Sequence, residues 1–209
     1  MTRLGIYGGT FSPIHLGHVK AAHAFLETMA LDRLLVIPTA VPPHKTAAAG
    51  ASASDRLTMT RLAFHDSEAF RSGRLEISDY EIERAGKSYT IYTLEHFSAP
   101  FTTLFLLVGT DMFLTLERWY RAADIFRLAD IVLMRRETDD AYDAAIQEKI
   151  RIYRDEYAAR IHVIDERPLE VSSTELRERL QSGQPTDGMI PQSVADYIRE
   201  NHLYQEKHS

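Results

Sequence analysis

Short apolar runs that alternate with helical segments constrain the fold of this 209-residue chain more than any other feature. The runs at residues 4–7, 34–37, 103–108 and 131–134 are apolar at nearly every position and end before glycine, proline or arginine. A strand that is apolar on both faces is typical of a parallel sheet that helices cover on both sides. The chain is therefore predicted to be an α/β protein with a doubly wound, mostly parallel sheet.

The segments between these runs carry apolar residues at helical spacing. Val19, Ala22, Leu26 and Met29, for example, would form one buried helix face. Further helices are predicted over residues 55–64, 90–97, 119–128 and 139–160, a last strand over 161–164, and an edge strand over 75–82. Two helices within residues 172–183 and 191–204 would form a small C-terminal helical part.

Composition excludes several classes of protein. The net charge of −6 argues against a broad basic surface for nucleic acid. The absence of cysteine excludes disulfides, thiolate nucleophiles and cysteine-ligated zinc. No apolar run reaches the roughly 18 residues that cross a bilayer, and no signal peptide is evident. We therefore expect one cytoplasmic domain over residues 1–209 that binds small molecules and neither nucleic acid nor membrane, with a homo-oligomer left open.

The stretch GGTFSPIHLGH, residues 8–18, follows the first predicted strand. Ligands in doubly wound sheets bind at the carboxyl ends of the strands, and glycines without a β-carbon let a phosphate approach the backbone N–H groups. A helix would begin at Pro13 with Ser12 as its cap, or nearer His15. Either start places His15 and His18 on one face near the helix N-terminus, which attracts anions. The stretch therefore predicts a phosphate site.

Other interpretations of this stretch remain open. Neither the G-K-[ST] of a Walker A loop nor a G-x-G-x-x-G fingerprint is present. A glycine turn with two incidental histidines is the plain alternative. A zinc site formed by His15, His18 and His44 is another alternative, although no H-E-x-x-H occurs.

The same stretch resembles the G-G-T-F-D-P-x-H-x-G-H signature of the HxGH nucleotidyltransferase superfamily, with Ser12 where the family usually has Asp. The resemblance implies a Rossmann-like fold and transfer of a nucleotidyl group from a nucleoside triphosphate to a phosphorylated acceptor. It implies that His15 and His18 stabilise the transition state at the α-phosphate. The residues of this stretch that would then contact ATP are Gly8, Gly9, Thr10, Phe11, His15 and His18.

A second anion site is predicted in VSSTELRERL, residues 171–180. Ser172 and Glu175 have the spacing of a capping box, and Gly183 suits the end of the helix. The first-turn N–H groups, with Arg177 one turn further on, could bind an anion, although a well-capped helix is the plain alternative. The stretch is similar to the superfamily's S-S-T-x-I-R. The resemblance implies that the β- and γ-phosphates of ATP contact Ser172, Ser173, Thr174 and Arg177.

Further stretches are similar to those of nicotinate-nucleotide adenylyltransferases. They are IPTAVPPHK at 37–45, SYTIYTLEHF at 88–97 with Tyr92 in place of the usual Asp, VGTDMFLTLERWY at 108–120 and IPQSVADYIRENHLY at 190–204. Trp119 lies between the polar side chains of Arg118 and Tyr120, where it would either pack partly buried or offer a flat surface for a pyridine ring.

The resemblance assigns roles to these segments. Thr90, Trp119 and Tyr120 would hold the nicotinate ring, and Lys45 would act as a catalytic cation on the acceptor's phosphate. On the ATP side it implies Gly109, Asp111 and Arg135, the last at the family's R-P-G turn, which here lacks Pro and Gly.

The reaction that the resemblance implies transfers AMP from ATP to nicotinate mononucleotide and releases pyrophosphate. Mg²⁺ would be held by the ATP phosphates, with no metal ligand from protein side chains. Nicotinamide mononucleotide and 4′-phosphopantetheine are alternative acceptors. A nucleotide-binding regulatory module without catalysis is the alternative from another class of protein.

Overall fold

The computed structural model of the chain describes residues 1–41, 50–135, 142–165, 169 and 171–205. The chain forms two compact units. The first comprises Met1–Gly8, Ala21–Leu35 and Tyr89–Pro168, and the second comprises Gly9–Lys20, Val36–Ser88 and Leu169–Ser209.

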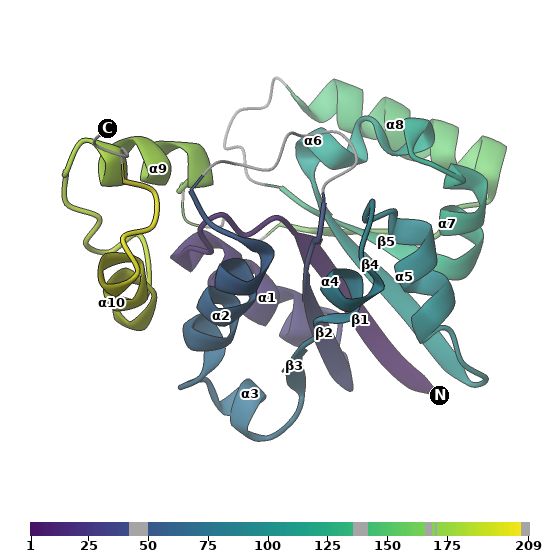
Figure 1. Ribbon diagram of the computed structural model, residues 1–209. Coiled ribbons are helices and arrows are strands. Elements are labelled where there is room, and N and C mark those ends of the chain that lie inside the picture. The colour runs from purple at the N-terminus through teal and green to yellow at the C-terminus, as the bar shows by residue number, and fades with distance from the viewer. Residues whose placement is uncertain (42–49, 136–141, 166–168, 170, 206–209) are drawn as a thin grey trace. The chain divides into compact units, whose positions relative to one another are not determined.

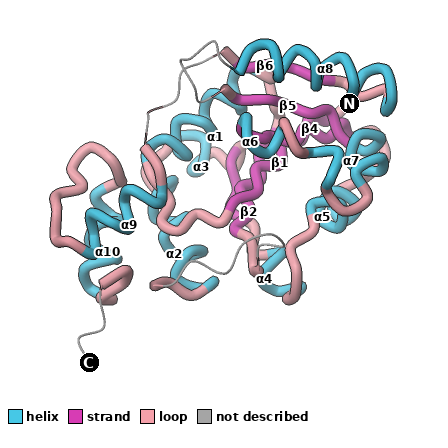
Figure 2. The backbone as a smooth tube through the Cα atoms, turned by 90° about the horizontal axis from the view of Figure 1, so that it is seen from above, coloured by secondary structure: helices cyan, strands magenta, loops and turns pink. Residues whose placement is uncertain are grey.

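A six-stranded sheet has the strand order β3-β2-β1-β4-β5-β6, with helices around it (Figures 1 and 2). The strands are β1 (Thr2–Gly9), β2 (Arg33–Pro38), β3 (Leu75–Ile77), β4 (Thr102–Gly109), β5 (Ala129–Met134) and β6 (Ile161–Ile164). The pairs β1–β4, β4–β5 and β5–β6 are parallel. The order reverses between β1 and β4, as in a doubly wound Rossmann-like sheet. The predicted fold class is confirmed.

In the first unit, β4 and β5 form the centre of the core. Residues 104–108 and 129–134 are buried along both strands, which explains why both faces are apolar. Helix α7 (Ala122–Leu128) packs against β5 and contacts both α5 (Thr90–Phe97) and α8 (Asp143–Tyr157) (Figure 1). The short helix α6 (Thr110–Phe113) and the 3₁₀ turn η1 (Leu116–Arg118) lie between β4 and α7 in the chain.

Helix α1 (Leu16–Thr28) connects β1 to β2. The second unit contains α2 (Ala53–Phe64), α3 (Glu68–Arg71), α4 (Tyr80–Arg84), α9 (Ser173–Gln181) and α10 (Gln192–Glu200). Side-chain hydrogen bonds join helix α10 to α2. The Tyr197 hydroxyl donates to the Asp55 carboxylate at 3.0 Å, and the Ser193 hydroxyl donates to the Leu62 carbonyl at 3.1 Å.

Several predicted elements differ from the structure in their bounds. The strand predicted over residues 75–82 ends at Ile77, because residues 80–84 turn into α4. The helix predicted from residue 119 begins at Ala122, because Arg121 adopts a left-handed backbone with φ 57°. The helix predicted over 139–160 is α8, which ends at a left-handed Ala158; residues 139–141 lie outside the described residues.

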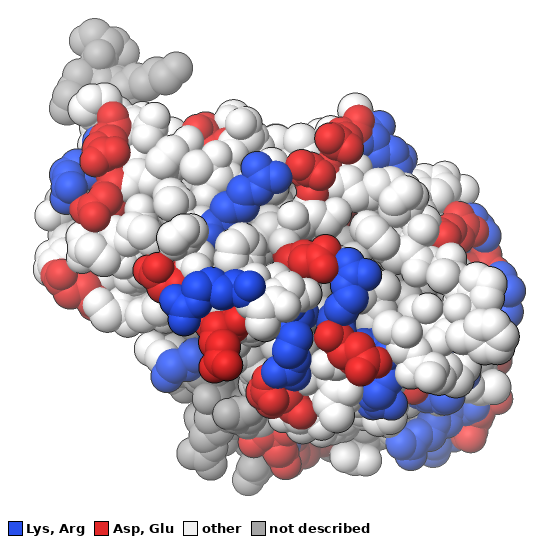
Figure 3. Space-filling model, turned by 90° about the horizontal axis from the view of Figure 1, so that it is seen from below, with Lys and Arg blue, Asp and Glu red and all other residues white. Residues whose placement is uncertain are grey.

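No helix within the described ranges is long and apolar enough to span a membrane. On the face drawn in Figure 3, basic and acidic side chains of the described residues are interspersed rather than gathered by sign.

Because Gly5 has no side chain, buried side chains of α1, β2 and their connection can pack directly against β1 within the first unit. A β-carbon at Gly5 would lie 2.5 Å from Leu31 Cδ1 and 3.0 Å from both Leu34 Cδ1 and Phe25 Cε1. We expect Gly5→Ala to lower the free energy of unfolding by about 1–3 kcal/mol, because three buried side chains must shift. Urea denaturation of the purified variant measures this loss.

Gly8→Ala is the matched control on the same strand. A β-carbon there would meet no atom of the described residues within 4 Å, its chain neighbours aside. We expect its free energy of unfolding to stay within about 0.5 kcal/mol of the wild type. Equal losses in the two variants would contradict the packing explanation.

Candidate active site

The loop before α1 does not follow the predicted cap. Helix α1 begins at Leu16, so the prediction of a first turn at Pro13 is wrong and the alternative start near His15 is confirmed. The reason is that the Ser12 hydroxyl does not cap a helix: it lies 3.0 Å from the Tyr204 hydroxyl. The Leu16 N–H, at the start of the helix, donates instead to the Met189 carbonyl at 2.9 Å.

His15 and His18 form a buried, stacked pair. Their ring centroids lie 3.6 Å apart with an interplanar angle of 23°, and the residues are 2% and 9% exposed. The Nδ1 atom of each ring accepts the backbone N–H of the other residue at 3.3 Å. A ring nitrogen that accepts a hydrogen bond carries no proton, so each neutral ring carries its proton on Nε2. The ring donors of the pair are therefore its two Nε2–H groups.

Gly17 permits this stacking. A β-carbon there would lie 3.0 Å from the His15 ring and 3.0 Å from the Leu169 carbonyl oxygen. The residue between the two histidines is therefore held in a space that a larger side chain would fill. The glycine of the H-x-G-H pattern is explained by this close approach.

The carbonyl oxygens of the loop are bound by side chains from α2 and α9. Arg56 donates to Thr10 at 2.8 Å, Arg177 donates to Ser12 at 2.7 Å, and Ser173 donates to Pro13 at 3.0 Å. These bonds bring together, within the second unit, the two stretches that the sequence predicted as anion sites. The donors neutralise the carbonyl side of the loop, which leaves its N–H groups better suited to an anion.

The predicted capping box on α9 forms only in part. The Ser172 hydroxyl accepts the Glu175 N–H at 3.1 Å, but the Glu175 carboxylate pairs with Arg179 at 3.0 Å instead of returning to the cap. The guanidinium of Arg177 also donates to the Thr174 hydroxyl at 3.0 Å. Hydroxyls and a guanidinium thus surround the first turn of α9, a donor set that suits phosphate oxygens.

Sequence reasoning missed Arg56. Its side chain is buried, with 5% of the residue exposed, and it also donates to the Ala40 carbonyl at 3.1 Å. Burial lowers the pKa of Arg56, and the nearby Tyr204 opposes that change. The signal in the sequence was the position of Arg56 beside the apolar Leu57, in the first turn of α2. An arginine is usually exposed, so one on the buried side of a helix needs a partner.

In the first unit, the residues predicted to contact the nucleotide follow the strands. Gly109 ends β4, Asp111 is exposed on α6, and Arg135 follows β5 directly. Arg135 forms ion pairs with Asp143 and, at 3.8 Å, with Asp165. Its guanidinium is therefore engaged by carboxylates of its own unit.

Of the predicted ring-binding residues, Tyr120 belongs to an aromatic group in the first unit. Tyr120 is 48% exposed, and its ring centroid lies 4.7 Å from that of Tyr89 and 6.0 Å from that of Tyr92. Trp119 is half-buried at the end of η1, and Thr90 is the first residue of α5. Tyr92 therefore adds a ring to a group in which the family usually has a carboxylate. Tyr89 was missed as a member.

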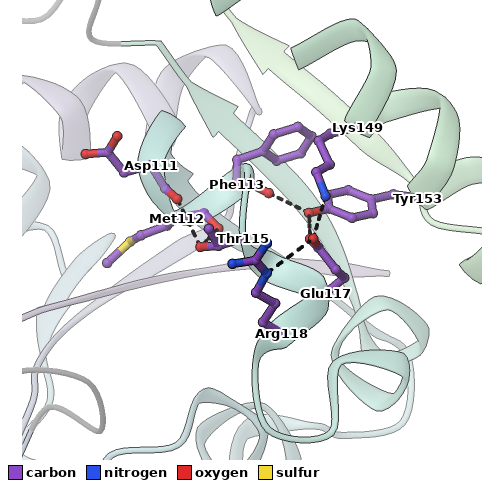
Figure 4. A network of polar contacts seen from close by, with 8 residues as sticks. All are labelled: Asp111, Met112, Phe113, Thr115, Glu117, Arg118, Lys149 and Tyr153. Atoms are coloured by element: carbon purple, nitrogen blue, oxygen red, sulfur yellow. Dashed lines mark hydrogen bonds and ion pairs between the residues drawn. The ribbon is translucent and has the colours of Figure 1, made fainter. Parts of the chain in front are cut away.

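The segment that carries Asp111 and Trp119 is anchored to α8 by a polar network (Figure 4). The Glu117 carboxylate accepts hydrogen bonds from Lys149 and Tyr153, and the fully buried Tyr153 hydroxyl also lies 2.7 Å from the Phe113 carbonyl oxygen.

Both acidic groups of this network respond to their surroundings. Burial alone would raise the pKa of Glu117, but hydrogen bonds from Lys149 and Tyr153 and the charge of Lys149 lower it overall. Burial and the neighbouring carboxylate raise the pKa of Tyr153, so the hydroxyl keeps its proton.

The predicted cation Lys45 and the alternative zinc ligand His44 lie outside the described residues. Among the residues that the structure describes, no group of three or more histidine, aspartate or glutamate side chains could hold a metal ion. The donors around the loop are N–H, hydroxyl and guanidinium groups, which bind phosphate rather than a divalent cation.

Residues 6–179 match the model of the cytidylyltransferase-like family. The chain is 36% identical to a protein of Desulfatibacillum aliphaticivorans named probable nicotinate-nucleotide adenylyltransferase, over 97% of this chain and 99% of that protein. It is 40% identical to a Synechococcus protein of the same name, over 97% and 94%. The chain belongs to the nicotinate-nucleotide adenylyltransferase family. The resemblance predicted from the motifs is confirmed.

The adenylyltransferase fold is also seen at low identity. A Plasmodium falciparum nicotinic acid mononucleotide adenylyltransferase complexed with NaAD matches 98% of this chain and 98% of its own, with a TM-score of 0.74 and 17% identity. At that identity the likeness shows a shared fold. The Ser12 and Tyr92 departures from the adenylyltransferase pattern therefore occur in a chain that keeps the family's fold.

The Glu117 network predicts an acid-dependent loss of stability in this adenylyltransferase. The pKa of Glu117 is lowered on folding, so its stabilising contribution is fully present above the ordinary value of 4.5 and is lost as the pH falls through the lower folded value. We expect Glu117→Gln to reduce the free energy of unfolding by about 1–3 kcal/mol at pH 7. The difference from the wild type should shrink below pH 4.5.

Chemical denaturation of both proteins between pH 7 and pH 3 measures this difference. Glu148→Gln is the control, because Glu148 forms an exposed ion pair with Arg151 at 2.7 Å on α8, the helix that carries Lys149 and Tyr153. An exposed ion pair contributes little, so this variant should follow the wild type at every pH. A Glu117→Gln difference that is constant with pH would contradict the assigned pKa change.

Proposed function

We propose that this protein transfers AMP from ATP to nicotinate mononucleotide, giving nicotinate adenine dinucleotide and pyrophosphate. The observation that carries the proposal is the buried, stacked pair of His15 and His18, whose rings carry Nε2–H donors beside a loop that is bonded to α9. The chain is similar over almost its full length to proteins named probable nicotinate-nucleotide adenylyltransferase, and this similarity supports the choice of substrates.

The reaction is an in-line displacement at the α-phosphorus of ATP. A phosphate oxygen of the acceptor forms the new bond to phosphorus, the bond to the bridging oxygen breaks, and pyrophosphate leaves with the electron pair. No covalent enzyme intermediate is needed, so the protein positions the reactants and stabilises charge. The Nε2–H groups of His15 and His18 donate to the α-phosphate oxygens, where negative charge develops in the transition state.

The other ATP phosphates are assigned to the loop and to α9. ATP contacts Gly8 and Gly9 at the end of β1 and Thr10 and Phe11 of the loop that follows, and its β- and γ-phosphates contact Ser172, Ser173, Thr174 and Arg177. The C-terminal part, residues 172–204, thereby completes the ATP site of a single nucleotidyltransferase domain over residues 1–209. Mg²⁺ bound to the phosphates would neutralise part of their charge.

The acceptor is assigned to the aromatic group of the first unit. Trp119 stacks on the pyridine ring, and Thr90 and Tyr120 donate to its carboxylate. Gly109 and Asp111 contact the nucleotide, with the Asp111 carboxylate accepting from ribose hydroxyls. Lys45 binds the acceptor phosphate, and Arg135 contacts ATP once its carboxylate partners release it.

The histidine pair gives the first test of this function. We expect His18→Ala to lower pyrophosphate release by about 100- to 1,000-fold, because a donor to the developing charge is lost. Circular dichroism should show an unchanged fold. The matched control is His65→Ala, whose side chain is 74% exposed in the same unit, and it should keep full turnover. Near-normal turnover in His18→Ala would reject the mechanism.

The acceptor is tested with nicotinate mononucleotide, nicotinamide mononucleotide and 4′-phosphopantetheine in parallel. We expect a strong preference for the nicotinate compound, and Trp119→Ala should raise its KM by about 3- to 10-fold through loss of ring stacking while the KM for ATP stays unchanged. Phe101→Ala, at an 82% exposed aromatic residue of the same unit, is the control. A preference for another acceptor would overturn the ring assignment and keep the phosphate assignment.

A further inference from the structure

Tyr204, near the C-terminal end of the chain, lies beside the loop of residues 10–15 that precedes α1. Its side chain is 2% exposed, and its hydroxyl lies 3.0 Å from that of Ser12, which is also 2% exposed. The Tyr204 N–H donates to the Gly50 carbonyl at 3.2 Å. A β-carbon at Gly50 would lie 2.9 Å from Tyr204 Cδ1, so this glycine leaves room for the ring.

Ser12 is consequently held at two atoms. Its carbonyl accepts from Arg177 at 2.7 Å, and its hydroxyl pairs with Tyr204. Ser12 precedes His15 by only three residues, so a change in the backbone of Ser12 is passed directly to the histidine pair. Breaking the hydroxyl pair would leave a buried polar group without its partner and allow the loop to shift.

Several charged groups lie near the Ser12–Tyr204 pair and affect the pKa of the Tyr204 hydroxyl. Burial raises the pKa of Tyr204 to about 12, while the Ser12 hydrogen bond and the charges of Arg56 and Arg177 oppose that rise. The carboxylate of Asp55 acts in the opposite direction, and it is itself bonded to Ser52 and Tyr197. With its pKa raised, the Tyr204 hydroxyl keeps its proton at physiological pH, so the Tyr204–Ser12 bond joins two neutral groups.

We propose that Tyr204 is a positioning residue for adenylyl transfer, which fixes the histidine pair through its hydrogen bond to Ser12. The inference rests on the proposed function and deepens it, because Tyr204 does not touch the reacting groups and acts only through the loop. His15 and His18 stabilise charge in the transition state, so an error in their position lowers kcat more than it raises KM.

Tyr204→Phe removes the hydroxyl and keeps the ring beside Gly50. We expect kcat to fall about 10-fold, with the KM for nicotinate mononucleotide within twofold of the wild type. Ser12→Ala should cause the same fall, and the double variant should be no slower than either single variant, because all three lack the same bond. Ser12→Asp should retain kcat, because a carboxylate still accepts from the Tyr204 hydroxyl.

Tyr197→Phe is the matched control. It removes another tyrosine hydroxyl bond of the same C-terminal part, to Asp55 at 3.0 Å, which does not involve the loop. Because Tyr197 is only half-buried, we expect this variant to lower thermal stability no more than Tyr204→Phe does, and to keep kcat. Equal losses of kcat in the two variants, or additive losses in the double variant, would overturn the positioning role.

A second readout does not depend on turnover. The imidazole NMR signals of His15 and His18, assigned with single alanine variants, should shift in Tyr204→Phe and stay in place in Tyr197→Phe. If the wild type released no pyrophosphate with any acceptor, the proposed function would fail while these shifts still tested the inference. Unshifted histidine signals in Tyr204→Phe would overturn it.

Discussion

The hydrogen bonds that hold the carbonyl oxygens of the loop before α1 are the constraint on which the candidate active site depends. Buried backbone carbonyl oxygens need hydrogen-bond donors, and in an irregular loop side chains can supply them. Arg56, Arg177 and Ser173 do this through Thr10, Ser12 and Pro13. The loop is thereby ordered by side chains from two different helices.

In the first unit, the segment that carries Asp111 and Trp119 is also held in place by side-chain hydrogen bonds. Helix α6 and η1 are too short to be stable alone, yet they carry Asp111 and lead to Trp119. The Glu117 carboxylate, held by Lys149 and Tyr153, fastens them to the long helix α8 (Figure 4). A buried polar network, and not helix propensity, therefore stabilises these two short elements.

The sequence was sufficient where local pattern decides the structure. The apolar runs predicted the strands, the helix over 90–97 matches α5, and Gly183 follows α9 with a left-handed backbone. Pattern could not predict Arg56, Glu117 or Tyr204, because their partners lie 46, 32 and 192 residues away. The cap predicted at Ser12 was wrong for the same reason: a distant hydroxyl competed with the local N–H groups.

The charge of the chain sharpens the role of these arginines. The protein carries a net charge of −6, so its overall field does not attract anionic nucleotides. Attraction must come from charges within about a Debye length of the loop, roughly 8 Å at physiological ionic strength. Arg56 and Arg177 both bond to the loop itself, and the N-terminus of α9 adds a partial positive charge. A serine at position 12, in place of the usual carboxylate, adds no negative charge beside these two arginines.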